Sequence, residues 1–435
     1  MAVGGDVMNA RISRFAGWTV SAGVVGVLTT MHVPPPAIAQ QADGVPMLLE
    51  NSTVKAALEA ARTSETQTIA DQIRFCEVPA PPFKEAARAG ELERAFKQQG
   101  LRNVRIDGAG NVLGVRPGAA PRPHLVIASH LDTVFPEETN VKVSRVGAQL
   151  RGPGIGDNCR GLAVLVATVR ALDRAKVQTP GTITFVANVG EEGLGDLRGM
   201  KALFGESLKG QIDRFVSIDG GGLHITNVAV GSHRYRVAFN GPGGHSFGAF
   251  GRSNPAHALG RAAAKIADLQ VPSQPKTTFN IGRIGGGTSV NAIPFEAWME
   301  VDMRSSDRAA LAALDAQFQA AVDSAVVEEN ARWGHSGGVT VKKELVGDRP
   351  AGSTPEGSAI VRTAEAVGRA LGVALVLAEG STDANIPMSM KIPAITIGAG
   401  GQGSDAHALS EWFDTTDSWK GTQNAVLLAI ALAQK

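Results

Sequence analysis

The stretch LVIASHLDTV, residues 125–134, decides the fold class of this chain. Its first five residues carry no charge and are mostly large and apolar, which is the pattern of a strand buried on both faces of a sheet. His130 and Asp132 then place polar side chains where that strand ends. Because ligands of open α/β sheets bind beyond the carboxyl ends of the strands, the stretch predicts both a buried sheet and the edge of it where chemistry occurs.

Helices alternate with further short strands around this stretch. An amphipathic helix is predicted over about residues 159–174, with apolar side chains repeating at helical spacing. Further β-rich runs are found at residues 182–189, 215–218 and 394–397. Strands that alternate with helices indicate a mostly parallel sheet covered by helices on both faces. The predicted fold class is therefore α/β.

Between about residues 230 and 347 the pattern changes. Strands are predicted at 232–240, 277–284, 297–304 and 339–346, and helices at 254–269 and 307–333. The resulting order βαββαβ is that of a ferredoxin-like domain. Asp307 is predicted to cap the second of these helices. Since the α/β pattern resumes afterwards, this segment is interpreted as an inserted lid or dimerisation domain.

The first 39 residues have the features of a secretory signal peptide. Arg11 and Arg14 precede an apolar run over residues 15–28, and the small-residue site Ala37-Ile38-Ala39 follows it. The run is shorter than the roughly 20 residues of a membrane-spanning helix, which favours cleavage over a membrane anchor. The mature protein is expected to be periplasmic or secreted and not bound to a membrane. The predicted organisation is a signal peptide (1–39), a catalytic domain in two parts (40–229 and 348–435) and the lid domain (230–347).

The composition excludes several classes of protein. The chain has 435 residues, 43% of them hydrophobic and 19% charged, which is ordinary for a globular protein of two domains. Its 42 Lys and Arg residues balance 41 Asp and Glu residues, so it offers no basic surface excess for nucleic acid. Two cysteines, Cys76 and Cys159, allow at most one disulfide and cannot form a structural zinc site. Any metal must be held by histidines and carboxylates.

Several other polar side chains share the strand-end position of His130 and Asp132. They are Glu191, Glu192, Asp219 and, after a glycine-rich loop, His407; Asp157 adds a carboxylate just before a helix, at its N-cap. Each alone has a simpler explanation as a helix cap, a turn residue or a solvated charge. Together at one edge of a sheet, the carboxylates would repel one another unless cations neutralised them, and nitrogen and oxygen ligands suit Zn²⁺ and related ions. The sequence therefore predicts a metal site.

Five segments in this order resemble the motifs of the dinuclear zinc aminoacylase/carboxypeptidase family. They are residues 130–134, 156–158, 191–193, 217–219 and 407–411. The family includes peptidase T, glutamate carboxypeptidase, acetylornithine deacetylase and succinyl-diaminopimelate desuccinylase. The resemblance extends over nearly the whole chain after residue 39, including the lid, and five ordered motifs are far more specific than any one of them.

The resemblance implies a role for each residue of the predicted site. His130 and Asp219 would hold one zinc ion, Glu192 and His407 the second, and Asp157 would bridge the two; Co²⁺ or Mn²⁺ are alternative metals. Asp132 would accept the second N–H of the His130 imidazole. Glu191 would stay free as the general base that takes a proton from water and passes it to the departing amine. The resemblance also suggests a cis peptide bond between Asp157 and Asn158.

Further site residues are implied in the lid and after the last strand. The glycine-rich lid loop matches that of the family, whose histidine, His245 here, would reach the active site of a partner subunit and stabilise the oxyanion. Arg304 would grip a substrate carboxylate, and Asn291 would donate to it or to the scissile carbonyl. Gly400, in the loop 398–401, would add a main-chain N–H donor. A homodimer formed through the lid is therefore expected.

The expected reaction is hydrolysis of an amide bond in small peptides. Residues 78–85 and 243–254 look more like the peptidase T branch than the deacetylases, which favours unblocked di- or tripeptides or an aminopeptidase activity. A carboxypeptidase or an N-acyl-amino-acid deacylase would use the same metals and the same carboxylate grip, and is the main alternative. A non-catalytic binding protein would lack a ligand or the base, whereas this chain has all of them.

Overall fold

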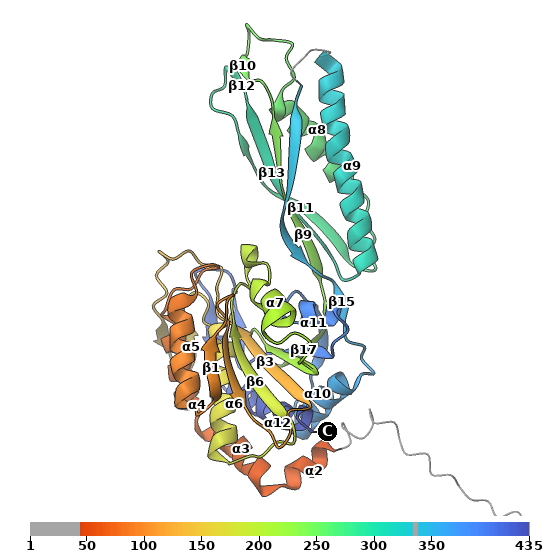
Figure 1. Cartoon of the computed structure of the whole chain (residues 1–435). Coiled ribbons are helices and arrows are strands. Elements are labelled where there is room, and N and C mark those ends of the chain that lie inside the picture. The colour runs from red at the N-terminus through yellow and green to blue at the C-terminus, as the bar shows by residue number, and fades with distance from the viewer. Residues whose placement is uncertain (1–43, 334–337, 435) are drawn as a thin grey trace, which may run out of the picture. The chain divides into compact units, whose positions relative to one another are not determined.

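The computed structural model describes residues 44–333 and 338–434 (Figure 1). The predicted signal peptide, residues 1–39, lies outside the described residues. Within the described part of the chain, no helix combines the length and the apolar character needed to cross a membrane.

A nine-stranded sheet forms the larger part of the fold. Its central strands are mutually parallel neighbours in the order β6 (Thr182–Asn188), β3 (His124–His130), β7 (Arg214–Ile218) and β17 (Ala394–Ile397). Strand β3 is buried along its whole length, as its uncharged sequence predicts. The outer strands are β1 (Arg102–Ile106) and β2 (Val112–Arg116) on one side, and β8 (His224–Ala229), β15 (Gly352–Ser353) and β16 (Val376–Gly380) on the other. The α/β fold class is confirmed.

Helices cover both faces of this sheet (Figure 1). Alternate residues of a strand point to opposite faces, and β3 shows this directly. Leu125 and Ile127 join one hydrophobic core, whereas Val126 and Ala128 join another. The first core lies under α2 (Val45–Glu50), α3 (Ser52–Thr63), α5 (Ala86–Gln98), α6 (Cys159–Arg174), α10 (Ala359–Ala370) and α12 (Trp419–Leu432). The second lies under α7 (Arg198–Ala202), η2 (Leu203–Ser207) and α11 (Asn385–Ser389).

A separate four-stranded antiparallel sheet, here called the lid sheet, is built from the inserted segment. Its strand order is β11 (Thr277–Gly286), β13 (Glu296–Ser305), β9 (Gly231–Asn240) and β14 (Thr340–Arg349). Helices α8 (Pro255–Ala267) and α9 (Arg308–Trp333) share its hydrophobic core. The predicted order βαββαβ is confirmed, and Asp307 caps α9 by accepting the N–H of Ala310 at 2.8 Å. The division of the chain into domains at residues 230 and 347 stays a prediction.

A third, small sheet was not predicted. Its strands run in the order β18 (Gln402–Ser404), β19 (Trp412–Asp414), β5 (Gln149–Arg151) and β4 (Ser144–Val146). Three residues are too few to show a strand period, so the sequence gives no signal for these elements. The pairing of β19 with β5 matters for the site, because Asp157 lies on the loop after β5 and His407 on the loop between β18 and β19. The remaining elements are α4 (Glu65–Cys76), η1 (Gly193–Gly195), β10 (Gly244–His245) and β12 (Ala292–Ile293).

Candidate active site

The predicted metal ligands converge at the carboxyl ends of the parallel strands. His130 is the last residue of β3, Asp219 directly follows β7, and Glu191 and Glu192 follow β6. Three groups of possible metal ligands form there, with the ligand atoms of each group within 4.8 Å of one another. The groups are His130 with Asp157 and Asp219, Asp157 with Glu192 and His407, and His130 with Glu191 and Glu192.

Asp157 lies between the two histidines and offers one carboxylate oxygen to each. Its Oδ1 lies 3.2 Å from the Nε2 of His130, and its Oδ2 lies 3.2 Å from the Nε2 of His407. The Nε2 of His130 is also 3.4 Å from Asp219 Oδ1, and the Nε2 of His407 is 3.1 Å from Glu192 Oε1. The site is thus made of two histidine–carboxylate pairs with a shared carboxylate between them.

These contacts change the proton affinities of the groups. The carboxylates of Asp157 and Glu192 raise the pKa of His407 to about 10. Burial raises the pKa of Glu192 and, more strongly, that of Glu191. Without a bound cation, these three side chains therefore bind protons more readily than they would in water. All the donors are imidazole nitrogens or carboxylate oxygens, so the chemistry of the set fits divalent cations such as Zn²⁺, Co²⁺ or Mn²⁺.

Asp132 differs from its predicted contact. The Nδ1 of His130 lies 3.0 Å from the main-chain oxygen of Asp132 and 3.8 Å from its carboxylate. The main-chain carbonyl is therefore the nearer acceptor for the imidazole N–H. The carboxylate of Asp132 instead accepts the main-chain N–H groups of Glu191 and Glu192, at 3.1 and 2.7 Å. Asp132 thus links the segment that carries His130 to the segment that carries the two glutamates.

Glu191 is buried and has a partner that the sequence did not predict. Its Oε1 accepts a hydrogen bond of 2.9 Å from Nη1 of Arg349, which is itself buried at the end of β14. Arg349 also donates to the main-chain oxygen of Glu191 and to Ser381. No sequence signal marks Arg349, because the expected strand ends three residues earlier and an arginine beside a proline is common in loops.

The two histidine–carboxylate pairs open into a cavity of about 320 Å³. Arg304, Arg234 and Arg349 line it together with Asp157, Glu191, Glu192 and Asp219. Arg234 and Arg304 share the carboxylate of Asp302, with bonds of 2.9 and 2.7 Å from their Nε atoms. Arg304 is 41% exposed, and its terminal nitrogens have no partner among the described residues. The cavity therefore combines a candidate metal site with guanidinium groups that can bind a carboxylate.

His245 and Asn291 do not line this cavity. They lie side by side on β10 and next to β12, where the N–H of Ser246 donates to Asn291 O at 2.9 Å. His245 is exposed, and its Nδ1 accepts the N–H of Phe247 at 3.2 Å. This leaves its Nε2 as the nitrogen available to a ligand.

Gly400 also differs from its prediction as a free donor. Its N–H donates to Gly222 O at 2.8 Å, so it is already used within the chain. Its φ of +78° and the 2.6 Å that would separate an added Cβ from the Gly421 nitrogen explain the glycine. Gly400 therefore serves the packing of the loop against α12.

The Asp157–Asn158 peptide bond is cis, as the resemblance suggests. Asn158 caps α6 by accepting the N–H of Gly161 at 3.2 Å, and it donates to Ile218 O at 2.9 Å. Cys159 begins α6 and is buried; Cys76 is buried in the same small apolar cluster, and the two are not joined by a disulfide. Cys159 thus packs at the helix start.

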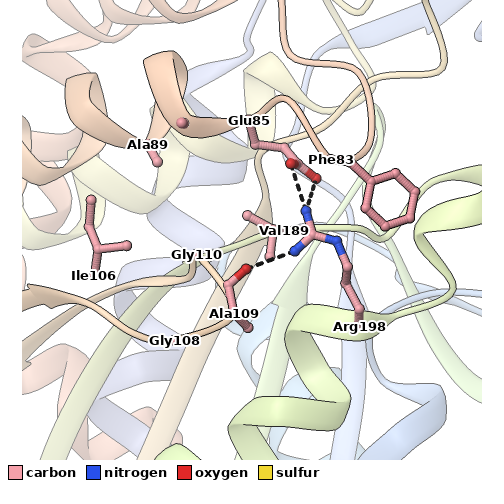
Figure 2. Close-up of a pocket in the computed structure, with 10 residues that line it drawn as sticks. Phe83, Glu85, Ala89, Ile106, Gly108, Ala109, Gly110, Val189 and Arg198 are labelled. Carbon is pink, nitrogen blue, oxygen red and sulfur yellow. Dashed lines mark hydrogen bonds and ion pairs between the residues drawn. The ribbon is translucent and has the colours of Figure 1, made fainter.

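A second cavity, of about 490 Å³, contains none of the predicted site residues. Figure 2 shows Arg198 within it, bonded to both carboxylate oxygens of Glu85 at 2.6 Å and to Ala109 O at 2.7 Å, with the Phe83 ring beside it. An added Cβ at Gly190 would lie 2.6 Å from Cγ of Arg198. Arg198 therefore packs directly against Gly190.

Comparison with known proteins identifies the family. The model of the family described as peptidase family M20/M25/M40 matches residues 126–431, which is more than half of the chain. The chain belongs to this family. The sequence resemblance is thereby confirmed, and the chain is a hydrolase of the metallopeptidase type with a candidate metal-ligand cluster.

Three individual proteins show how far the similarity extends along the chain. The uncharacterized protein YqjE of Bacillus subtilis is 24% identical over 359 residues, which are 78% of this chain and 91% of that protein. Carboxypeptidase G2 of Pseudomonas sp. is 31% identical over 180 residues, 39% of this chain and 40% of that protein. The solved structure of aminopeptidase PepT from Bacillus cereus is 22% identical with a TM-score of 0.68, covering 85% of this chain and 99% of that one, which shows a shared fold.

Proposed function

We propose that this member of the family is a dinuclear, zinc-dependent peptidase that hydrolyses an amide bond in small unblocked peptides. His130 and Asp219 would hold one cation, Glu192 and His407 would hold the second, and Asp157 would contribute to both sites. The observation that carries the proposal is the position of Asp157, whose two oxygens lie 3.2 Å from two different histidines. A single-ion site would not need a carboxylate directed at two separate ligand pairs.

The proposed mechanism assigns the proton transfers to Glu191. When bound, the two cations lower the pKa of the attacking water and polarise the scissile carbonyl. Glu191 accepts a proton from that water at its carboxylate and delivers it to the nitrogen of the departing amine. Its burial and its hydrogen bond to Arg349 hold the carboxylate in one orientation. Asp132 fixes the main chain of both glutamates, so the base and a ligand keep a constant separation.

The arginines of the cavity support recognition of a substrate carboxylate. No described residue bonds to the terminal nitrogens of Arg304, and Asp302 fixes the Nε of its guanidinium group. This arrangement suits a planar, two-point interaction with the C-terminal carboxylate of a peptide. The same grip would serve a carboxypeptidase or an N-acyl-amino-acid deacylase, and the partial similarity to carboxypeptidase G2 supports that second candidate.

A panel of three related peptides distinguishes these candidates. We expect the free tripeptide to be cleaved, the C-amidated tripeptide to lose at least about tenfold in kcat/KM because Arg304 loses its partner, and the N-blocked peptide to be a poor substrate. Steady-state assays with product identification provide the measurement. Preferred cleavage of the N-blocked peptide would instead favour the deacylase or carboxypeptidase.

We further propose that the protein is a homodimer in which His245 completes the active site of the partner subunit. At one end of the lid sheet Arg349 pairs with Ser232. This end lies beside the site, because Arg349 bonds to Glu191. His245 follows Asn240, at the opposite end of β9. Ser232 and Asn240 are eight positions apart along an extended strand, a length of about 26 Å. His245 is therefore remote from its own Glu191, and an oxyanion donor at this position would have to come from a second subunit.

Subunit mixing tests the dimer. His245→Ala and Glu191→Gln should each be nearly inactive alone. After the two variants exchange subunits, one site of each mixed dimer regains both groups, so we expect up to about half of the wild-type activity per mixed dimer. Activity is measured after exchange, which is verified by the mass of differently tagged subunits. Absence of recovery despite verified exchange, or full wild-type activity in a sedimenting monomer, would contradict the proposal.

We also propose export from the cytoplasm, supported by the signal-like pattern of residues 1–39. Intact mass spectrometry of the chain recovered from the periplasm or medium tests it. A chain that begins at Gln40 is the expected result, and a full-length chain confined to the cytoplasm would contradict it.

A further inference from the structure

Glu411 lies against the loop that carries Asp157. Its carboxylate accepts three main-chain N–H groups of that loop, from Gly154 at 2.7 Å, Gly156 at 2.8 Å and Asp157 at 3.0 Å. The side chain is almost completely buried, with 2% of its surface exposed. A buried carboxyl group that accepts three main-chain N–H groups is a directional contact, because the donors fix the positions of both of its oxygens.

The opposite side of the same loop is held by helix α4. Gln72 donates to Ile155 O at 2.8 Å, and the thiol of Cys76 donates to Pro153 O at 3.4 Å. The N–H groups of the loop thus bond to Glu411 and its carbonyl groups bond to α4. The conformation of the segment before Asp157 is therefore determined from both sides, and only the Glu411 side belongs to the segment that carries His407.

We infer that Glu411 is a positioning residue that sets the separation of Asp157 and His407 and so builds the second of the two cation sites. Glu411 is four residues after His407, and its main chain also accepts the N–H of Gly152 at 3.0 Å. It thus links the loop that carries Asp157 to the loop that carries His407 through four hydrogen bonds. The inference rests on the proposed role of Asp157 and His407 as ligands. Glu411 itself would contact neither substrate nor cation.

The substitution Glu411→Gln tests this role with little change in size. One oxygen of Glu411 serves Gly156 and Asp157, and the other serves Gly154. An amide keeps only one acceptor oxygen and places an NH₂ group against a main-chain N–H, so at least one of the three bonds is lost. We expect the second cation to bind about 10- to 100-fold more weakly, while the first, held by His130 and Asp219, keeps its affinity.

Two measurements read out the effect. Calorimetric titration of the metal-free protein with Co²⁺ gives the affinity of each site, and His407→Ala, which removes a proposed ligand of the same site, provides the scale. Hydrogen exchange in the metal-free protein is independent of any cation. There we expect the amides of Gly154, Gly156 and Asp157 to exchange at least about tenfold faster in Glu411→Gln than in the wild-type chain.

Glu329→Gln is the matched control. Glu329 is a fully buried carboxylate on α9 of the lid, and it lines no part of the proposed site. It accepts a main-chain N–H from Asn254 and side-chain bonds from Arg261 and Trp333. The substitution Glu329→Gln should lower the stability of the fold without changing the affinity for either cation or the rate of amide hydrogen exchange at residues 154–157. A comparable loss of cation affinity in Glu329→Gln would show a general effect of destabilisation and would overturn the inference.

The remaining outcomes are also decisive. If Glu411→Gln fails to fold, Gly156→Ala gives a milder change, because the added Cβ would lie 3.2 Å from Oε1 of Glu411 and displace it slightly. Weaker binding of the second cation is expected there too. Unchanged cation affinities and exchange rates in a folded variant would overturn the inference alone, whereas a wild-type chain that binds no cation would contradict the proposed function.

Discussion

Replacement of Glu191 by glutamine is expected to reduce kcat by about 10²- to 10⁴-fold while both cations stay bound. The amide can still accept the hydrogen bond that Arg349 gives to Oε1 of Glu191, so the site keeps its shape. It cannot take a proton from water, and the transfer to the departing amine is lost as well. The measurement combines steady-state kinetics on a tripeptide with elemental analysis of the same sample.

Glu85→Gln is the control for this variant. Glu85 is also buried and paired with an arginine, Arg198, but it belongs to the second cavity and lines no part of the proposed site. Its kcat should stay within a few-fold of wild type. Near wild-type turnover in Glu191→Gln, or loss of cations in parallel with activity, would show that Glu191 is a ligand or a bystander and not the base.

Much of the candidate site follows from one physical rule. Parallel strands present their carboxyl ends at the same edge of a sheet, so polar residues after several buried runs must meet. This applies to His130, Glu191, Glu192 and Asp219, all of which lie at strand ends in the structure. The four long strands and two helices of the lid were equally accessible to prediction, because they are long enough to show their periods.

Other contacts could not be predicted because they depend on tertiary structure. Asp157 and His407 meet through a sheet whose strands have three residues each, too short for any pattern. Arg349 reaches Glu191 because β14 is longer than its apolar pattern suggests. The acceptor of the His130 N–H depends on a difference of less than 1 Å between two oxygens of Asp132, and a sequence motif does not carry that information.

Removal of the cations is the second change from which we expect a large effect on turnover. Without them the carboxylates of the site repel one another and the attacking water keeps its ordinary pKa, so turnover should fall by more than about 10²-fold. Metal-free protein is prepared with a chelator and checked by elemental analysis. The fold should persist, because the hydrophobic cores of the large sheet and of the lid sheet do not involve the site.

Stepwise addition of Zn²⁺ to this metal-free protein, with bound zinc and hydrolysis of an unblocked tripeptide followed in the same samples, tests the central claim most directly. The proposed two-ion site predicts no significant turnover at the start, recovery as zinc binds, and saturation of tight binding at two ions per chain. Undiminished turnover in the metal-free protein, or tight binding that saturates at a single ion, would contradict it.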